Sequence, residues 1–124
     1  MRILVCGGRD FTGYTLLFNI LEEIWNREHK PGTEFVVIEG DATGADFLAK
    51  CWVIHEFKHP KEHLETYPAN WKLYGKKAGP IRNQQMLDEG KPDIVLAFPT
   101  ENSVGTWDMI ERAKKNNLDI RIFE

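Results

Sequence analysis

Two glycines and an arginine directly follow the first apolar run of the sequence. Gly7 and Gly8 allow a backbone to approach a ligand closely and to adopt positive φ, and Arg9 can hold a phosphate or carboxylate through two parallel hydrogen bonds. A glycine pair is also common turn chemistry, and Gly-Gly-Arg is not the full G-x-G-x-x-G fingerprint. We favour a ligand-binding role because parallel sheets bind ligands at the carboxyl ends of their strands.

A second glycine-rich segment contains Gly40, Gly44 and Asp46. Thr43, three residues before Asp46, completes a pattern that resembles a capping box, in which both residues stabilise a helix start without any ligand. In a functional interpretation, Asp46 faces a cleft and accepts hydrogen bonds from a ribose or an amine. The two roles are compatible, and both stay open.

Three cations gather where a third helix is predicted to begin. Lys76 and Lys77 precede Arg82, which the pattern places in the first helical turn, where a cation opposes the macrodipole by up to about 1 kcal/mol. Such cations repel one another unless an anion lies among them, so the cluster predicts a phosphate site. The alternative is a solvated loop in which Arg82 pairs with Asp88 or Glu89.

Two further groups could complete this site. Trp71 and Tyr74 could stack on a nucleobase, or they could cover the core. Gly105 and Thr106, at the start of the last predicted helix, could hold a second phosphate oxygen. A plain helix cap by Ser103 or Thr106 would explain the same residues.

Strand-like and helix-like patterns alternate along the chain and must position these residues. Apolar runs predict strands, and apolar residues at 3.6-residue spacing predict helices. We therefore expect an α/β, Rossmann-like fold with a mostly parallel sheet of about five strands and helices on both faces. All the unusual segments then fall on the carboxyl edge of that sheet. The predicted strands are 2–6, 35–38, 64–67, 93–98 and 119–123, and the helices centre on 17–24, 45–52, 80–87 and 106–113, with a long loop at 68–79.

Size and composition limit the broader possibilities. The chain has 124 residues, 42% of them hydrophobic, which predicts one domain over 1–124. It has no apolar stretch of the roughly 20 residues that span a bilayer and runs directly into a strand, so we expect a cytoplasmic protein without membrane contact. A net charge of −3 argues against a general nucleic-acid coat but allows a local basic patch.

The cysteines and histidines predict neither a disulfide nor a metal site. Cys6 and Cys51 lie in apolar segments without a C-x-x-C pair, and we interpret both as buried thiols. His55, His59 and His63 repeat every four residues, but Pro60 should end the helix before the third could join a metal site. We expect no bound metal and no cofactor, and we leave self-association into a homo-oligomer open.

Together these motifs resemble the DUF2493, or YspA/cpYpsA-related, family of the SLOG superfamily, a set of small bacterial and phage proteins. Relatives in that superfamily include phosphoribohydrolases that activate cytokinins and the DNA-processing protein DprA, whose helix start looks like Arg82-Asn83. The resemblance implies a Rossmann-like fold and a site for nucleotides or nucleotide-derived ligands. It rests on CGGRDF at 6–11, GDATGAD at 40–46, ANW at 69–71, YGKKAGPIRNQ at 74–84 and GTWDM at 105–109.

The resemblance does not extend to the catalytic motif of the phosphoribohydrolases. Those enzymes use Pro-Gly-Gly-x-Gly-Thr-x-x-Glu, whereas here Met109 stands in the place of the Glu and the two glycines after Pro99 are missing. Asp108 is displaced by one residue, which is about 100° around a helix.

Three functions follow from these residues. The first is binding of a nucleotide or nucleotide-derived phosphate ligand, through Gly7, Gly8, Arg9 and the segments described above. The second is hydrolysis of a nucleotide N-glycosidic bond, with a carboxylate that stabilises an oxocarbenium-like centre or activates water. The third is binding of single-stranded nucleic acid through the basic and aromatic stretch. The candidate carboxylates for hydrolysis are Asp10, Asp46 and Asp108.

Overall fold

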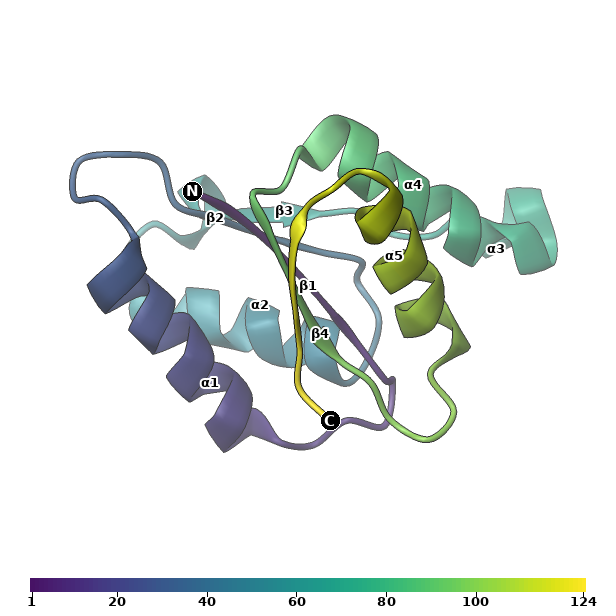
Figure 1. Cartoon of the computed structure of the whole chain (residues 1–124), viewed down its shortest axis with the longest axis horizontal. Helices are drawn as coiled ribbons and strands as arrows, with labels where there is room; N and C mark the ends of the chain where they lie inside the picture. The colour runs from purple at the N-terminus through teal and green to yellow at the C-terminus, as the bar shows by residue number, and fades with distance from the viewer.

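A computed structural model describes the whole chain, residues 1–124, as an α/β fold built on one sheet. The sheet has five strands in the order β3-β2-β1-β4-β5, and every neighbouring pair is parallel (Figure 1). The predicted Rossmann-like fold is confirmed. The order reverses between β1 and β4, the place where open parallel sheets bind ligands. The strands are β1 (Arg2–Gly7), β2 (Val36–Glu39), β3 (Leu64–Thr66), β4 (Ile94–Phe98) and β5 (Asp119–Ile122).

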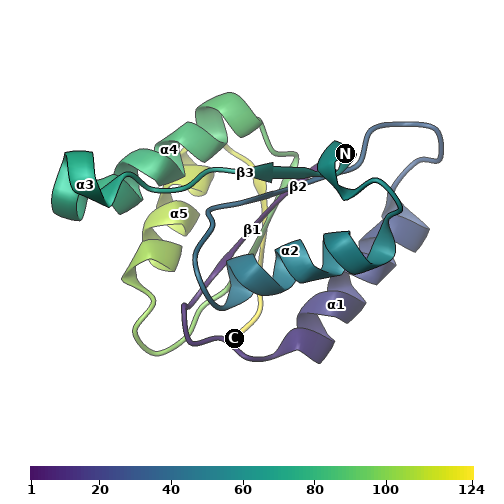
Figure 2. The ribbon, with the colours of Figure 1, turned by 180° about the vertical axis from the view of Figure 1, so that it is seen from behind.

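Helices cover both faces of the sheet. α1 and α2 pack on one face, and α4 and α5 pack on the other, as Figures 1 and 2 show from opposite sides. Five π-helical residues, Ile24–Glu28, continue α1. The helices are α1 (Tyr14–Glu23), α2 (Ala45–Glu56), α3 (Trp71–Tyr74), α4 (Ala78–Gly90) and α5 (Val104–Lys115), with short 3-10 turns at Pro60–Glu62 and Gly75–Lys77.

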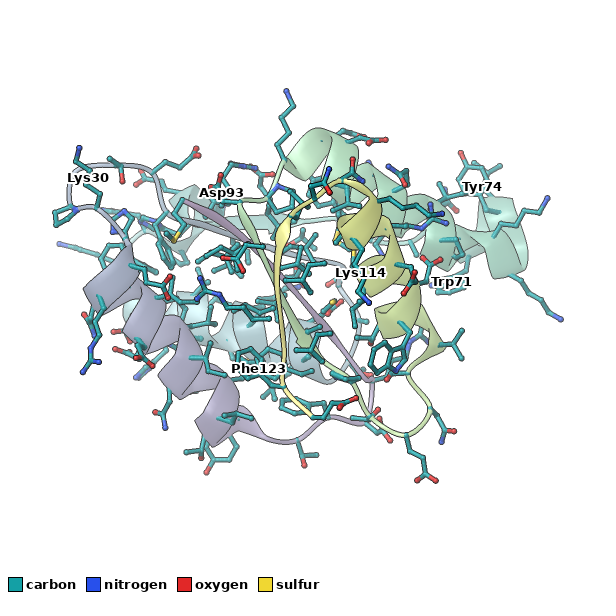
Figure 3. All side chains as sticks on the ribbon, in the orientation of Figure 1. Lys30, Trp71, Tyr74, Asp93, Lys114 and Phe123 are labelled. Carbon is teal, nitrogen blue, oxygen red and sulfur yellow. The ribbon has the colours of Figure 1, made fainter.

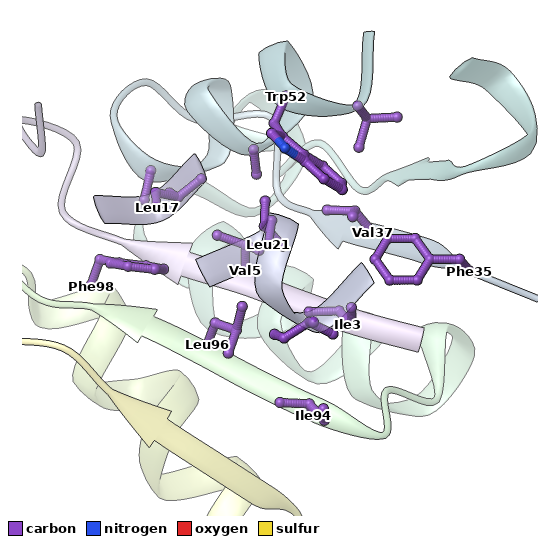
Figure 4. Close-up of a cluster of buried hydrophobic side chains, with 14 residues drawn as sticks. Ile3, Val5, Leu17, Leu21, Phe35, Val37, Trp52, Ile94, Leu96 and Phe98 are labelled. Atoms are coloured by element: carbon purple, nitrogen blue, oxygen red, sulfur yellow. The ribbon is translucent and has the colours of Figure 1, made fainter. Parts of the chain in front are cut away.

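The core lies in two layers because side chains alternate across each strand. In β1, Ile3 and Val5 face α1 and α2, whereas Leu4 and Cys6 face α4 and α5. Figure 4 shows the first layer, in which Trp52 of α2 is almost fully buried. Residues 3–6 of β1 and all of β4 are continuous apolar runs because both of their faces are covered.

The predicted loop at 68–79 is mostly helical, so that prediction is wrong. Asn70 starts α3 by accepting a hydrogen bond from Leu73 N at 3.0 Å. α4 begins at Ala78, and Pro80 fits its third position because the first N–H groups of a helix lack intrahelical partners. Arg82 is therefore the fifth residue of α4, beyond the first turn. The dipole argument for an anion at Arg82 is correspondingly weaker.

The thiols differ from each other. Cys6 is buried and Cys51, on α2, only half-buried, so the interpretation of both as buried is wrong for Cys51.

The structure shows neither a metal site nor a membrane helix. His63 Nδ1 lies 2.8 Å from Phe35 O, directly before β2. No three side chains of the metal-binding types come together. None of the helices has the length and apolar character needed to cross a membrane.

Candidate functional site

A cavity of about 630 Å³ lies at the carboxyl ends of β1 and β4, where the strand order reverses. An adjoining cavity of about 350 Å³ includes Gly40 in its lining. Gly44 and Lys77 line neither cavity, whereas Lys76 lines the larger one. All three candidate carboxylates, Asp10, Asp46 and Asp108, border the larger cavity. The other predicted ligand-binding residues that line it are Gly7, Gly8, Arg9, Trp71, Arg82, Asn83, Gly105 and Thr106.

The glycines after β1 are needed for packing within the chain. A Cβ at Gly7 would lie 2.5 Å from Ala45 Cβ and 2.7 Å from Phe98 O, so its absence lets β1, β4 and the start of α2 meet. A Cβ at Gly8 would lie 2.7 Å from Thr100 Cβ, because the Thr100 side chain fills that space. Close packing thus accounts for both glycines, and their contact with a ligand stays a prediction.

Gly44 joins the start of α2 to the loop after β1. Its φ of 76° favours glycine, and a Cβ there would run into the backbone of Gly8 and Arg9. Thr43 Oγ1 donates to Arg9 O at 3.0 Å instead of capping α2. The capping-box interpretation is therefore wrong for Thr43, and Gly44 lies behind the site.

Asp46 holds the turn between β2 and α2. Its Oδ2 accepts hydrogen bonds from Gly40 N at 3.1 Å and Ala42 N at 3.3 Å, and only 6% of the residue is exposed. Burial raises the pKa of Asp46 to about 6; the nearby Arg82 opposes this rise and Glu39 adds to it. Asp46 can therefore exchange a proton close to neutral pH, which suits an acid–base group.

Glu39 is a second acid in this region that the sequence interpretation missed. It is fully buried at the end of β2, where Oε1 accepts from Asp41 N at 2.9 Å and Oε2 has no partner. Burial raises the pKa of Glu39 above its usual value. An acid directly after an apolar strand was the available signal. Glu39 lines neither cavity, but it lies close enough to Asp46 to help raise the pKa of that acid.

Arg82 reaches from α4 toward these acids. Its Nη1 donates to Gly40 O and its Nε to Asn83 Oδ1 at 3.2 Å, whereas Nη2 makes no hydrogen bond within the chain. Burial lowers the pKa of Arg82, Asp46 opposes that shift, and Arg9 adds to it. The predicted alternative of a pair with Asp88 or Glu89 is wrong. Arg82 instead presents free donors to both cavities.

Arg9 and Trp71 line both cavities, as Arg82 does. The Arg9 guanidinium carbon lies 5.2 Å from the centre of the Trp71 ring, a cation–π contact. Arg9 is exposed and has no carboxylate partner. Trp71 and Tyr74 both stand on α3, which projects from the body (Figure 3). Two arginines thus border the cavities without an ion pair.

The starts of α4 and α5 are tied together by Asn83. Its Nδ2 donates to Gly105 O at 3.1 Å and to Asp108 Oδ2 at 3.0 Å, and Arg112 Nε donates to the same oxygen at 2.8 Å. Burial acts to raise the pKa of Asp108, but the hydrogen bonds from Arg112 and Asn83 outweigh it and lower that pKa. The Asn83 amide is thus engaged within the chain, and Asp108 is held ionised.

The first turn of α5 has no side-chain cap. Ser103 stands at the N-cap position, but its hydroxyl accepts from Thr100 N at 2.8 Å and donates to Thr100 O at 2.7 Å. The cap interpretation is therefore wrong for Ser103. Thr106 is buried with only 4% exposed, and the backbone around Gly105 borders the cavity. This leaves the positive end of a helix open to an anion.

The YspA, cpYpsA-related SLOG family model matches residues 1–74, which include both glycine-rich loops and Trp71. The chain belongs to this SLOG family. It is also similar to the Gene 61 protein of Mycobacterium phage D29, with 32% identity over 123 residues that cover 96% of this chain and 93% of the phage protein. No solved structure matches. SLOG membership indicates nucleotide-related binding or processing.

This SLOG protein differs from the phosphoribohydrolase pattern in how α5 faces the cavity. Met109, in the place of the catalytic Glu, is fully buried in the core between α5 and the sheet. Asp108 borders the cavity in its stead, but its carboxylate is occupied by Asn83 and Arg112. Among the carboxyl groups that border the cavity, Asp46 has a pKa raised to about 6.

Proposed function

We propose that this protein binds a nucleotide or a nucleotide-derived phosphate ligand in the cavity at the carboxyl ends of β1 and β4. The observation that carries the proposal is the pair of guanidinium groups, Arg9 and Arg82, that border the cavity without a carboxylate bonded to either. Arg82 is also half-buried, and burial lowers its pKa despite the nearby Asp46. A phosphate would supply the missing acceptors.

Other features support an anion at the same place. The uncapped first turn of α5 lines the same cavity as Arg82, and its N–H groups point away from the helix body. Lys76 is exposed and adds a third positive charge to the cavity lining, and no acidic residue occurs between Glu65 and Asp88. Trp71 offers an aromatic face on which a base can stack. Phosphate and base would thus contact neighbouring side chains, because Arg9 lies over the Trp71 ring.

The proposal is tested by isothermal titration calorimetry with nucleoside mono- and diphosphates of all four bases, the free nucleosides, and a single-stranded oligonucleotide. Binding of nucleotides but not of nucleosides is the expected result, because the cations recognise phosphate. Binding of the oligonucleotide alone, with a steep salt dependence, would instead favour the nucleic-acid function. No binding by any probe would refute both.

Hydrolysis of an N-glycosidic bond is a second candidate, favoured by Asp46. This acid borders the cavity with a pKa near 6, so it can accept or donate a proton at neutral pH. Incubation with the nucleoside monophosphates followed by chromatography measures released base. Release that is lost in Asp46→Asn would support hydrolysis, whereas intact nucleotides with measurable binding would leave a binding protein.

A further inference from the structure

The two cavities share their charged wall. The smaller cavity adjoins the larger one and has four lining residues in common with it, Arg9, Ala42, Trp71 and Arg82. Both arginines of the candidate site are thus at the boundary between two spaces. A ligand confined to the larger cavity would make no contact with the smaller one.

The position of the arginines suits a linking anion. Arg9 contributes to lowering the pKa of Arg82, which means that the two positive charges are close enough to repel. Arg9 is oriented by Trp71, and Nη2 of Arg82 has no partner within the chain. An anion between them would relieve the repulsion and fill the free donors. Its substituents could extend into the two cavities in opposite directions.

The smaller cavity has the chemistry of a sugar site. Its wall includes the turn after β2, with the carboxylate of Asp41 and the hydroxyl of Thr43, beside the apolar atoms of Pro68 and Ala69. Lys50 Nζ holds Asp41 Oδ1 at 2.7 Å, so this carboxylate is fixed in place. The fixed carboxylate can accept hydrogen bonds from sugar hydroxyl groups, and so can the Thr43 hydroxyl oxygen, whose own proton is donated to Arg9 O.

We propose that the ligand is a diphosphate substituted at both ends, a nucleoside in the larger cavity and a sugar-bearing group in the smaller one, with the diphosphate between Arg9 and Arg82. This inference rests on the proposed function and narrows its ligand class. The acidic residues around the site favour it as well. A terminal phosphate carries up to about one more negative charge than an esterified one, and it would lie near Asp41 and Asp46.

The test compares matched ligands of one base at a time by calorimetry. AMP, ADP and ADP-ribose form the adenine series, and GDP-mannose, UDP-glucose and CDP-glucose extend it with the mono- and diphosphates of their bases. In at least one series the disubstituted diphosphate is expected to bind about tenfold or more tightly than both the mono- and the diphosphate. Equal affinities within every series would overturn the inference while leaving nucleotide binding intact.

A variant at Ala69 separates the two cavities. Ala69 lines only the smaller cavity and makes no side-chain hydrogen bond, so Ala69→Phe should fill that space. In Ala69→Phe, the disubstituted diphosphate should lose its tenfold gain in affinity, while the affinity for the monophosphate stays unchanged. Ala69→Ser leaves the space open and should keep that gain. Thermal melts establish that both variants are folded. A gain that survives Ala69→Phe would overturn the inference, and absence of binding by every probe would overturn the proposed function itself.

Discussion

Replacing Arg82 with Ala tests the site at the group on which most of its chemistry depends. If the free donors of Arg82 bind phosphate, the loss of charged hydrogen bonds should cost roughly 1.5–3 kcal/mol of binding free energy. That corresponds to an increase in Kd of about 10- to 150-fold at 25 °C. Arg82→Lys should recover only part of this, because an ammonium restores the charge but not the planar pair of donors.

The same substitution has a structural cost that the sequence alone did not indicate. If Arg82 stood in the first helical turn, its replacement by Ala would leave the stability of the ligand-free protein unchanged or slightly higher. Arg82 lies beyond that turn, however, and donates a hydrogen bond to Gly40 O. Removing this bond should lower stability by about 1 kcal/mol, or about 4 °C in melting temperature. The pKa of Asp46 should also rise further, because Arg82 opposes its upward shift.

Calorimetric titration and thermal melts distinguish these effects. Arg27→Ala is the matched control, since it removes the same charge from a side chain that is 78% exposed outside the cavities. The control should bind nucleotide like the parent. An Arg82→Ala protein with normal Kd and a strongly lowered melting temperature would refute the phosphate assignment and leave Arg82 a structural residue.

Three further predictions address the acids and the glycine turn. The folded-state pKa of Asp46 is raised, so its contribution to stability is present at low pH and is lost as pH rises through about 6. The melting temperature of Asp46→Asn relative to that of the parent should therefore rise as the pH increases from about 4 to about 6, and a difference that does not change with pH would contradict this. For Asp108 the sign is opposite: its pKa is lowered, so the stability lost in Asp108→Asn should be largest near neutral pH and shrink on acidification. An Asp108→Asn deficit that persists in acid would show that the carboxylate charge is not what matters. Gly8→Ala should be destabilised by its clash with Thr100, and Thr100→Gly in the same chain should recover part of that loss. Purely additive effects in this double-mutant cycle would show that the two residues do not meet.

A Gly8→Val substitution would not report on ligand binding alone. The Thr100 side chain already occupies the space beside Gly8, so any larger residue should disturb the loop after β4 first. Binding measurements on Gly8 variants therefore need the melting temperature of each variant beside them.

The layered fold was predictable because its signals are local. Residues 3–6 of β1 and all of β4 are apolar, and the predicted strand 35–38 differs from Val36–Glu39 by one residue at each end. α3 was not predictable, because four residues do not complete enough turns to show a period. The edge at which the site lies also followed from the strand–helix alternation alone.

The roles of single residues in the site were harder to predict. Thr43 fits a capping box by spacing, but its hydroxyl is used by Arg9 O, a partner far away in the sequence. Lys77 and Lys76 are neighbours, and only the path of the turn before α4 decides that Lys76 borders the cavity. Burial of Glu39 likewise depends on segments that meet only in the fold. Such contacts between distant segments leave no local pattern.

The projection of α3 makes the site sensitive to its own occupancy. A helix of four residues is far below the length of about 12 that helices need in isolation, so α3 depends on its surroundings for order. Trp71, on this helix, borders both cavities. A ligand that stacks on Trp71 would therefore lend α3 stability that its own sequence lacks, and slower amide hydrogen exchange at 71–77 would report it. The order of α3, a helix at the surface, would then depend on whether a ligand occupies the cavities.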